Sequence, residues 1–282
     1  MHYTNNNLQS LIQYQALSPS RAEDFRQCPL LYKFRVIDKL TETKSFAQLK
    51  GLLVHIALEQ LYKLPSNKRM YKMAINLLEP SLEQMKIKYP QISYKKFKLI
   101  LITEARNLIS NYYYLESPTQ FYTKSYEHLI EINLKNGTPL KGFIDRVDSL
   151  SSGEVRIVDY KTGKTPYKIE DYTKLKVIFQ MKFYAVMILN LYGVVSRQIS
   201  ILYLTGCQEI NYYPTSEELK RFEYKLASIW RAIKIAKSLK EFPPNPSHLC
   251  LWCKYKNLCP AFSRMPLACR KVNKNKEMYK HA

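Results

Sequence analysis

The sequence predicts an α+β fold, in which a central mixed β-sheet with a meander is flanked by helices. Helical periodicity dominates the first 115 residues, whereas the segments that follow are short and rich in β-forming side chains. The turn sequences Asn136-Gly137 and Ser151-Ser152-Gly153 separate these segments, as expected between antiparallel strands. We therefore expect a helical insertion near the N-terminus, a sheet in the middle and a Cys-rich knot near the C-terminal end.

The individual elements follow from periodicity, caps and helix-breaking prolines. Ser18 or Ser20 caps the first helix, Pro65 ends the second, and Pro90 separates the next two. Apolar runs bounded by turn residues mark the strands. We expect helices over 18–36, 46–63, 67–88, 93–115, 171–192 and 216–239, and strands over 121–134, 139–149, 154–161, 197–205 and 208–213.

No internal repeat or long linker divides the chain. We expect one domain over 18–262, preceded by a polar leader at 1–17 and followed by a basic tail at 263–282. Within this domain, residues 64–116 form the helical insertion and residues 245–262 form the Cys-rich segment.

The chain is strongly basic, since 44 lysines and arginines against 23 acidic residues give a net charge of +21. With 13% aromatic residues, this favours a surface that neutralises phosphates and stacks on bases, so DNA is the expected partner. No membrane association is expected, because the longest apolar run, Phe183 to Val195, is shorter than the ~20 residues of a spanning helix. We see no secretory signal and expect a cytoplasmic protein, or one of an organellar stroma or matrix.

Two acidic motifs lie on neighbouring predicted strands. Asp145 falls near the end of one strand, while Asp159 and Lys161 lie two residues apart on the next and so share a face. In a hairpin Asp145 and Asp159 would meet, and a cation between them would relieve their repulsion. Carboxylates suit Mg²⁺ or Mn²⁺, and a lysine beside them could orient a water or stabilise charge during phosphodiester hydrolysis. The alternative is a surface pair of carboxylates with a solvated lysine.

Two helical pairs share a face by their i, i+4 spacing: His55 with Glu59, and Gln180 with Tyr184. His55 could bind a metal and Glu59 could orient it, although a packing histidine is the more common case. By themselves, Gln180 and Tyr184 fit the polar edge of a packed helix equally well.

Six cysteines without an export signal argue against disulfides. Cys250, Cys253 and Cys259 follow a C-x2-C-x5-C pattern, which indicates a metal site whose fourth ligand lies elsewhere. Cys28 is the best candidate, and with a local triplet it fits a four-thiolate iron–sulfur cluster better than a zinc ribbon. Such a site would join the N-terminal helix to the C-terminal segment. The remaining candidates are Cys207, Cys269 and, in a zinc site, His248.

Taken in this order, these residues resemble the RecB-type branch of the PD-(D/E)xK nuclease superfamily, in its iron–sulfur subclass. This subclass includes the AddB nuclease domain and the CRISPR-associated iron–sulfur exonucleases. The resemblance spans Leu17 to about Phe262 and implies a restriction-endonuclease-like core. No G-x-x-x-x-G-K-[ST] loop occurs in the chain, so the expected partner besides DNA is a helicase or other repair protein acting in trans.

The resemblance also implies a role for each residue. Gln180 and Tyr184 match a Gln-x3-Tyr motif that positions the DNA and supports the catalytic lysine. The implied catalytic residues are Lys161, Asp145, Asp159, Gln180 and Tyr184; the implied Mg²⁺ or Mn²⁺ ligands are His55, Asp145 and Asp159; the implied ligands of a [4Fe–4S] cluster are Cys28, Cys250, Cys253 and Cys259.

The function implied by the resemblance is that of a metal-dependent deoxyribonuclease, an exonuclease on single strands or DNA ends, in DNA repair, recombination or related processing. Two alternatives belong to other classes: a non-catalytic DNA-binding subunit of a repair complex, and a zinc-stabilised RNA-binding protein. The complete set of Asp145, Asp159 and Lys161 favours the enzyme, because a protein that only binds DNA does not need it.

Overall fold

The computed structural model of the 282-residue chain describes residues 16–90, 97–150, 153–166 and 172–263. These residues form two compact units. Unit 1 contains residues 16–18 and 44–225, and unit 2 contains residues 19–43 and 226–263. Most of the expected polar leader and nearly all of the basic tail lie outside the described residues. The expected single domain over 18–262 stays a prediction.

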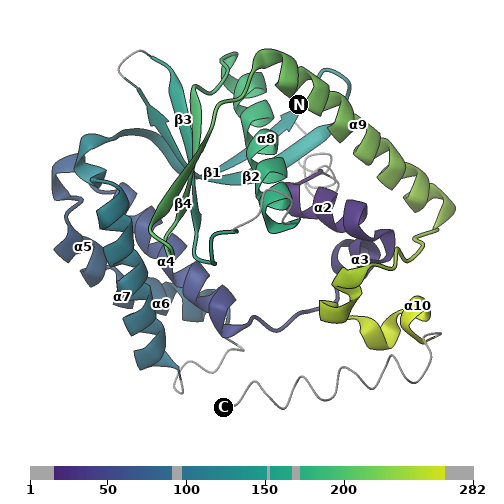
Figure 1. Ribbon diagram of the computed structural model, residues 1–282, viewed down its shortest axis with the longest axis horizontal. Helices are drawn as coiled ribbons and strands as arrows, with labels where there is room; N and C mark the ends of the chain where they lie inside the picture. Colours follow the sequence, from purple (N-terminus) through teal and green to yellow (C-terminus); the bar gives the residue numbers. More distant parts are fainter. Residues whose placement is uncertain (1–15, 91–96, 151–152, 167–171, 264–282) are drawn as a thin grey trace, which may run out of the picture. The chain divides into compact units, whose positions relative to one another are not determined.

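A five-stranded sheet forms the centre of unit 1 (Figure 1). The strands follow one another in sheet order, and only β3 and β4 pair in parallel. Parallel neighbours need a crossover connection, and α8 (Tyr172–Tyr192) provides it. The predicted α+β fold with a mixed sheet and a meander is therefore confirmed. The strands are β1 (Tyr122–Asn133), β2 (Pro139–Ser149), β3 (Val155–Lys161), β4 (Gln198–Tyr203) and β5 (Gln208–Tyr212).

Four helices cover one face of this sheet, where Val158 and Tyr160 of β3 pack into a core formed with α4, α6 and α7 (Figure 1). The helix expected over 67–88 is divided at Leu77. Pro80 explains the division, because its nitrogen cannot donate to the preceding turn and its ring clashes there. Ser45 and Gln48 form a capping box at the start of α4. The four helices are α4 (Phe46–Tyr62), α5 (Tyr71–Asn76), α6 (Leu78–Lys88) and α7 (Lys98–Leu115).

Helix α8 packs on β1 and β2. The approach is close at Gly142 of β2, because a Cβ added there would lie 3.1 Å from atoms of both Tyr184 and Met187.

Among the described residues, the segment Leu175–Tyr192 is the one stretch long and apolar enough to cross a membrane, with a mean hydropathy of 1.3. Half of that segment is buried inside the structure. These properties are also those of a core helix, which is the role of α8 in unit 1.

Unit 2 begins with α2 (Pro19–Gln27), and the helix expected over 18–36 is interrupted at Cys28. Cys28 is extended, with φ −165°, because the ring of Pro29 disfavours helical geometry in the residue before it. Helix α9 (Ser216–Leu239) agrees with the prediction and belongs to unit 2 from residue 226 onward. The other elements of unit 2 are α3 (Pro29–Tyr32), a π-helical turn (Lys33–Ile37), two 3-10 turns (His248–Trp252 and Lys256–Leu258) and α10 (Pro260–Ser263).

Candidate active site

The side chains of β3 that face α8 form the first part of the candidate site. Lys161 Nζ lies 2.6 Å from Asp159 Oδ2 and donates to Gln180 Oε1 at 2.9 Å. The Gln180 amide in turn donates to Asp159 Oδ1 at 3.3 Å and to the Tyr184 hydroxyl at 2.9 Å. The two-residue spacing on the strand and the four-residue spacing on the helix therefore bring these four polar side chains together.

Asp145 of β2 and His55 of α4 complete the site. His55 Nδ1 lies 3.4 Å from Asp145 Oδ1, while Asp145 Oδ2 accepts the backbone N–H of Tyr160 at 2.8 Å. The antiparallel pairing of Arg146 with Val158 brings Asp145 close to β3, as expected from the sequence. The contribution of Tyr160 was not expected, because a backbone amide leaves no signal in a sequence pattern.

The approach of α4 to this end of β3 depends on a glycine. Gly51 lies one turn before His55, and a Cβ at this position would lie 2.7 Å from Thr162 Oγ1. A side chain there would force Thr162, the residue after Lys161, to change its side-chain conformation or to move away from the helix. Glu59, one turn after His55, forms an ion pair with Lys63 at 2.7 Å.

The two carboxyl groups of the site differ in acidity. Burial favours a higher pKa for Asp145, but the His55 imidazole, the Lys161 ammonium and the Tyr160 amide outweigh it and hold this pKa below its ordinary value. Burial raises the pKa of Asp159 to about 6; Lys161 opposes this rise and the charge of Asp145 reinforces it. An additional positive charge beside Asp159 would therefore lower its pKa back toward the ordinary value.

The donor set of this site suits a divalent cation. Asp159 is 2% exposed, and the positive charge that faces its Oδ2 in the described structure is the Lys161 ammonium, at 2.6 Å. Two carboxylates and an imidazole are donors suited to Mg²⁺ or Mn²⁺. As the residues stand, Asp145 pairs with His55 and Asp159 pairs with Lys161. Within the described ranges, no group of three His, Cys, Asp or Glu side chains is already arranged to hold a single metal ion.

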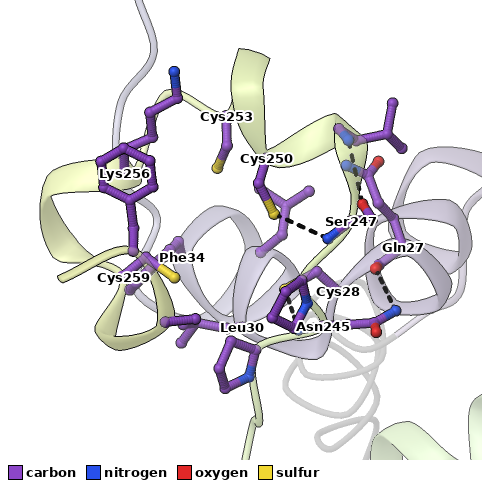
Figure 2. A pocket seen from close by; sticks show the side chains of 16 residues that line it. Gln27, Cys28, Leu30, Phe34, Asn245, Ser247, Cys250, Cys253, Lys256 and Cys259 are labelled. Carbon is purple, nitrogen blue, oxygen red and sulfur yellow. Dashed lines mark hydrogen bonds between the residues drawn. The ribbon is translucent and has the colours of Figure 1, made fainter. Parts of the chain in front are cut away.

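Four cysteines line one pocket in unit 2 (Figure 2). Cys28 lies between α2 and α3, Cys250 in the turn His248–Trp252, Cys253 directly after that turn, and Cys259 directly before α10. The fold of unit 2 therefore brings the distant Cys28 to the local C-x2-C-x5-C segment. The apolar side chains lining the same pocket include Leu30, Leu31, Phe34, Leu249 and Phe262.

The surroundings of these sulfurs suit thiolates bound to a positively charged group. The backbone N–H of Asn245 donates to Cys28 Sγ at 3.3 Å, and that of Ser247 donates to Cys250 Sγ at 3.4 Å (Figure 2). Burial raises the pKa of Cys253; the Tyr255 amide opposes this rise, and the charges of the other three cysteines reinforce it. Four thiolates in this pocket would repel one another without a cation.

The other candidates for a fourth ligand lie elsewhere. Cys207 belongs to unit 1, in the turn between β4 and β5, and His248 does not line the pocket although it starts the same turn as Cys250. Cys269 lies outside the described residues.

A comparison with known protein families identifies the superfamily to which this chain belongs. A family model described as the PD-(D/E)XK nuclease superfamily matches residues 16–260, so the chain belongs to this superfamily. This match covers every residue of the candidate site and all four pocket cysteines. A search of curated protein sequences found no match.

Among solved structures, the chain is similar to a "Putative exonuclease" from Eubacterium rectale. The TM-score is 0.58 at 15% sequence identity, over 96% of this chain and 98% of that one, which shows a shared fold. A second structure, SSO0001, has a TM-score of 0.38 at 16% identity, over 92% of this chain and 89% of that one, a similarity too low to carry an argument.

Proposed function

We propose that this protein is a Mg²⁺- or Mn²⁺-dependent deoxyribonuclease that acts as an exonuclease on single strands or DNA ends, in DNA repair, recombination or related processing. The observation that carries the proposal is the proximity of two pairs in unit 1, His55 with Asp145 and Asp159 with Lys161, between which the backbone N–H of Tyr160 donates to Asp145. The nuclease superfamily to which the chain belongs and the name of its relative from Eubacterium rectale support the same activity.

Each side chain has a distinct task in this proposal. His55, Asp145 and Asp159 would hold the cation, which would supply Lewis-acid stabilisation and a more acidic water. Lys161 presents a positive charge beside Asp159 and stabilises the negative charge that develops on the phosphoryl oxygens. Gln180 bonds both Lys161 and Asp159 and thereby fixes their relative position, with its amide held by Tyr184.

Cleavage of end-labelled DNA in the presence of Mn²⁺ tests this proposal. Linear single-stranded DNA, linear duplex and closed circular single-stranded DNA of matched sequence distinguish an exonuclease from an endonuclease. We expect the linear substrates to be degraded and the circle to survive. Cleavage of the circle would make the protein an endonuclease, and equal stability of all three substrates would contradict the nuclease proposal. RNA of the same sequence is the comparison that tests the preference for DNA.

DNA is the proposed substrate because the net charge of +21 and the 23 tyrosines supply phosphate-neutralising and base-stacking groups. A helicase or other repair protein acting in trans would deliver the strand.

We place the protein in the cytoplasm or in an organellar stroma or matrix, because the five described cysteines are free and thiols stay reduced in these compartments.

Protons and the cation should compete for Asp159, whose pKa is raised to about 6. Because bound metal must displace this proton, we expect the Mn²⁺ affinity to fall at least about tenfold for each pH unit below 6 and to level off above about pH 7. Titration calorimetry with Mn²⁺ between pH 5 and pH 8 measures this dependence. An affinity that stays constant from pH 5 to pH 7 would contradict the role of Asp159 as a ligand.

We also propose that Cys28, Cys250, Cys253 and Cys259 bind a structural [4Fe–4S] cluster. The four thiols share one apolar pocket, and two of them accept backbone N–H groups, as thiolate ligands of such clusters commonly do. The cluster would supply the positive charge that four neighbouring thiolates need. It would also join the segment before α3 to the segment before α10 within unit 2.

Cys28→Ser should remove the cluster, because this change takes away the one ligand outside the C-terminal segment. We expect the anaerobically purified variant to lose the absorbance near 400 nm and the roughly four iron atoms per chain of the wild-type protein. Cys207→Ser is the matched control and should keep both. Zinc in place of iron in the wild-type protein, or unchanged iron in Cys28→Ser, would contradict the assignment.

A further inference from the structure

Arg146 follows Asp145 in β2, so its side chain points to the opposite face of the sheet. This side chain is fully buried, at 0% exposure. Its Nη2 donates to both carboxylate oxygens of Glu116, at 3.1 and 3.0 Å, and its Nε donates to Asp148 at 3.0 Å. Because Glu116 directly follows α7, Arg146 connects the helical insertion to the strand that carries Asp145.

The buried charges around Arg146 are balanced. Arg156 is also buried and lies 2.6 Å from Glu116, so two arginines face the two carboxylates of Glu116 and Asp148. A balanced buried network pays a desolvation cost that apolar side chains of the same size would avoid. Stability alone is therefore a weak explanation for this network beside the candidate site.

Three buried phenols gather on the same guanidinium. Arg146 Nη1 lies within hydrogen-bond distance of the hydroxyls of Tyr160 at 2.8 Å, Tyr112 at 3.2 Å and Tyr62. The hydroxyls of Tyr62 and Tyr112 also lie 2.6 Å apart. Tyr160 alone of the three belongs to the strand that carries the site.

Tyr160 touches the candidate site with its other atoms. It stands between Asp159 and Lys161 in the chain, and its backbone N–H donates to Asp145. Its ring meets the ring of His55 edge to face, with centroids 6.0 Å apart. A shift of this one residue would therefore displace four of the proposed functional groups.

We propose that Arg146 is a positioning residue of the active site and that it acts through Tyr160. The guanidinium of Arg146 holds the hydroxyl of Tyr160. With its hydroxyl held, Tyr160 fixes the Asp145 carboxylate through its backbone N–H and the His55 imidazole through its ring. Glu116 fixes Arg146 in turn, so α7 supports the site from a distance. This inference rests on the proposed function, since it assigns a support to the same site.

Tyr160→Phe tests the inference, because it removes the hydroxyl and keeps the ring. Tyr112→Phe is the matched control: it removes a hydroxyl from the same guanidinium, and that hydroxyl bonds only Tyr62 and Arg146 among the described residues. We compare Mn²⁺ affinity and cleavage kinetics under conditions in which both variants are folded. The midpoint of urea unfolding measures the stability of each variant. We expect similar losses of stability, but a roughly tenfold weaker Mn²⁺ affinity and a 10- to 100-fold lower kcat with unchanged KM, for Tyr160→Phe alone.

The metal-free protein gives an independent signal, since the imidazole resonances of His55 should shift in Tyr160→Phe and not in Tyr112→Phe. Equal effects of both variants on Mn²⁺ affinity and kcat would reduce the network to a structural role and overturn the inference. Wild-type values in Tyr160→Phe would overturn it as well, while the proposed function would stand. A wild-type protein that neither binds Mn²⁺ nor cleaves DNA would overturn both.

Discussion

Asp159→Asn should lower the rate of DNA cleavage by at least about 10³-fold, which corresponds to ~4 kcal/mol of transition-state stabilisation. The metal-free variant should nevertheless be as stable as the wild-type protein or more stable. The pKa of Asp159 is raised to about 6 in the fold, above its ordinary value of 3.8. The folded protein therefore binds more protons than the unfolded chain between these two values, and this group's contribution to stability falls as the pH rises through them. A neutral amide removes that penalty at pH 8 but also removes a ligand.

Initial rates of cleavage with Mn²⁺ and urea unfolding of the metal-free protein measure the two effects.

Lys161→Ala should lose cleavage to a similar degree and keep its Mn²⁺ affinity, because the lysine is not a ligand. Lys141 is the matched control, since it is similarly buried and pairs with Glu131 in the same sheet. Wild-type rates in Asp159→Asn, or an equal loss in Lys141→Ala, would contradict the assigned roles.

Arg146→Leu should destabilise unit 1 by about 3–5 kcal/mol, because it leaves the carboxylates of Glu116 and Asp148 buried with one cation fewer. The midpoint of urea unfolding, followed by circular dichroism, measures the loss. Arg197→Leu is the control: its side chain is 65% exposed and lies 3.8 Å from Glu154, so the change should cost less than about 1 kcal/mol. Similar midpoints for the two variants would contradict the description of Arg146 as the centre of a buried network.

Local spacing was sufficient to predict much of the site. Asp159 and Lys161 share a face because strand side chains alternate, and Gln180 and Tyr184 share one because they are a helical turn apart. The structure connects these two pairs through hydrogen bonds of the Gln180 side chain. The position of His55 beside Asp145 could not follow from spacing, because ninety residues of helices and strands separate them; the family resemblance pointed to it.

Other features depend on contacts between distant elements. Glu116 looks like an ordinary polar residue after an amphipathic helix, yet it is 7% exposed and binds two arginines of the sheet. In the sequence, Arg146 resembles a surface arginine. The packing of α4 and α7, which bring Tyr62 and Tyr112 onto its guanidinium, buries it in the fold. The interruption of the first helix at Cys28, in contrast, has a local cause in Pro29 that the sequence already contains.

The most direct test is the location of Mn²⁺ in crystals of the protein soaked with this ion, by anomalous diffraction at the manganese edge. We expect an anomalous peak within about 2.5 Å of oxygens of Asp145 and Asp159 and near a ring nitrogen of His55, with Lys161 beside it. The same crystals of Asp159→Asn should lack that peak. A wild-type crystal with manganese bound elsewhere, and none between these carboxylates, would contradict the metal-dependent active site.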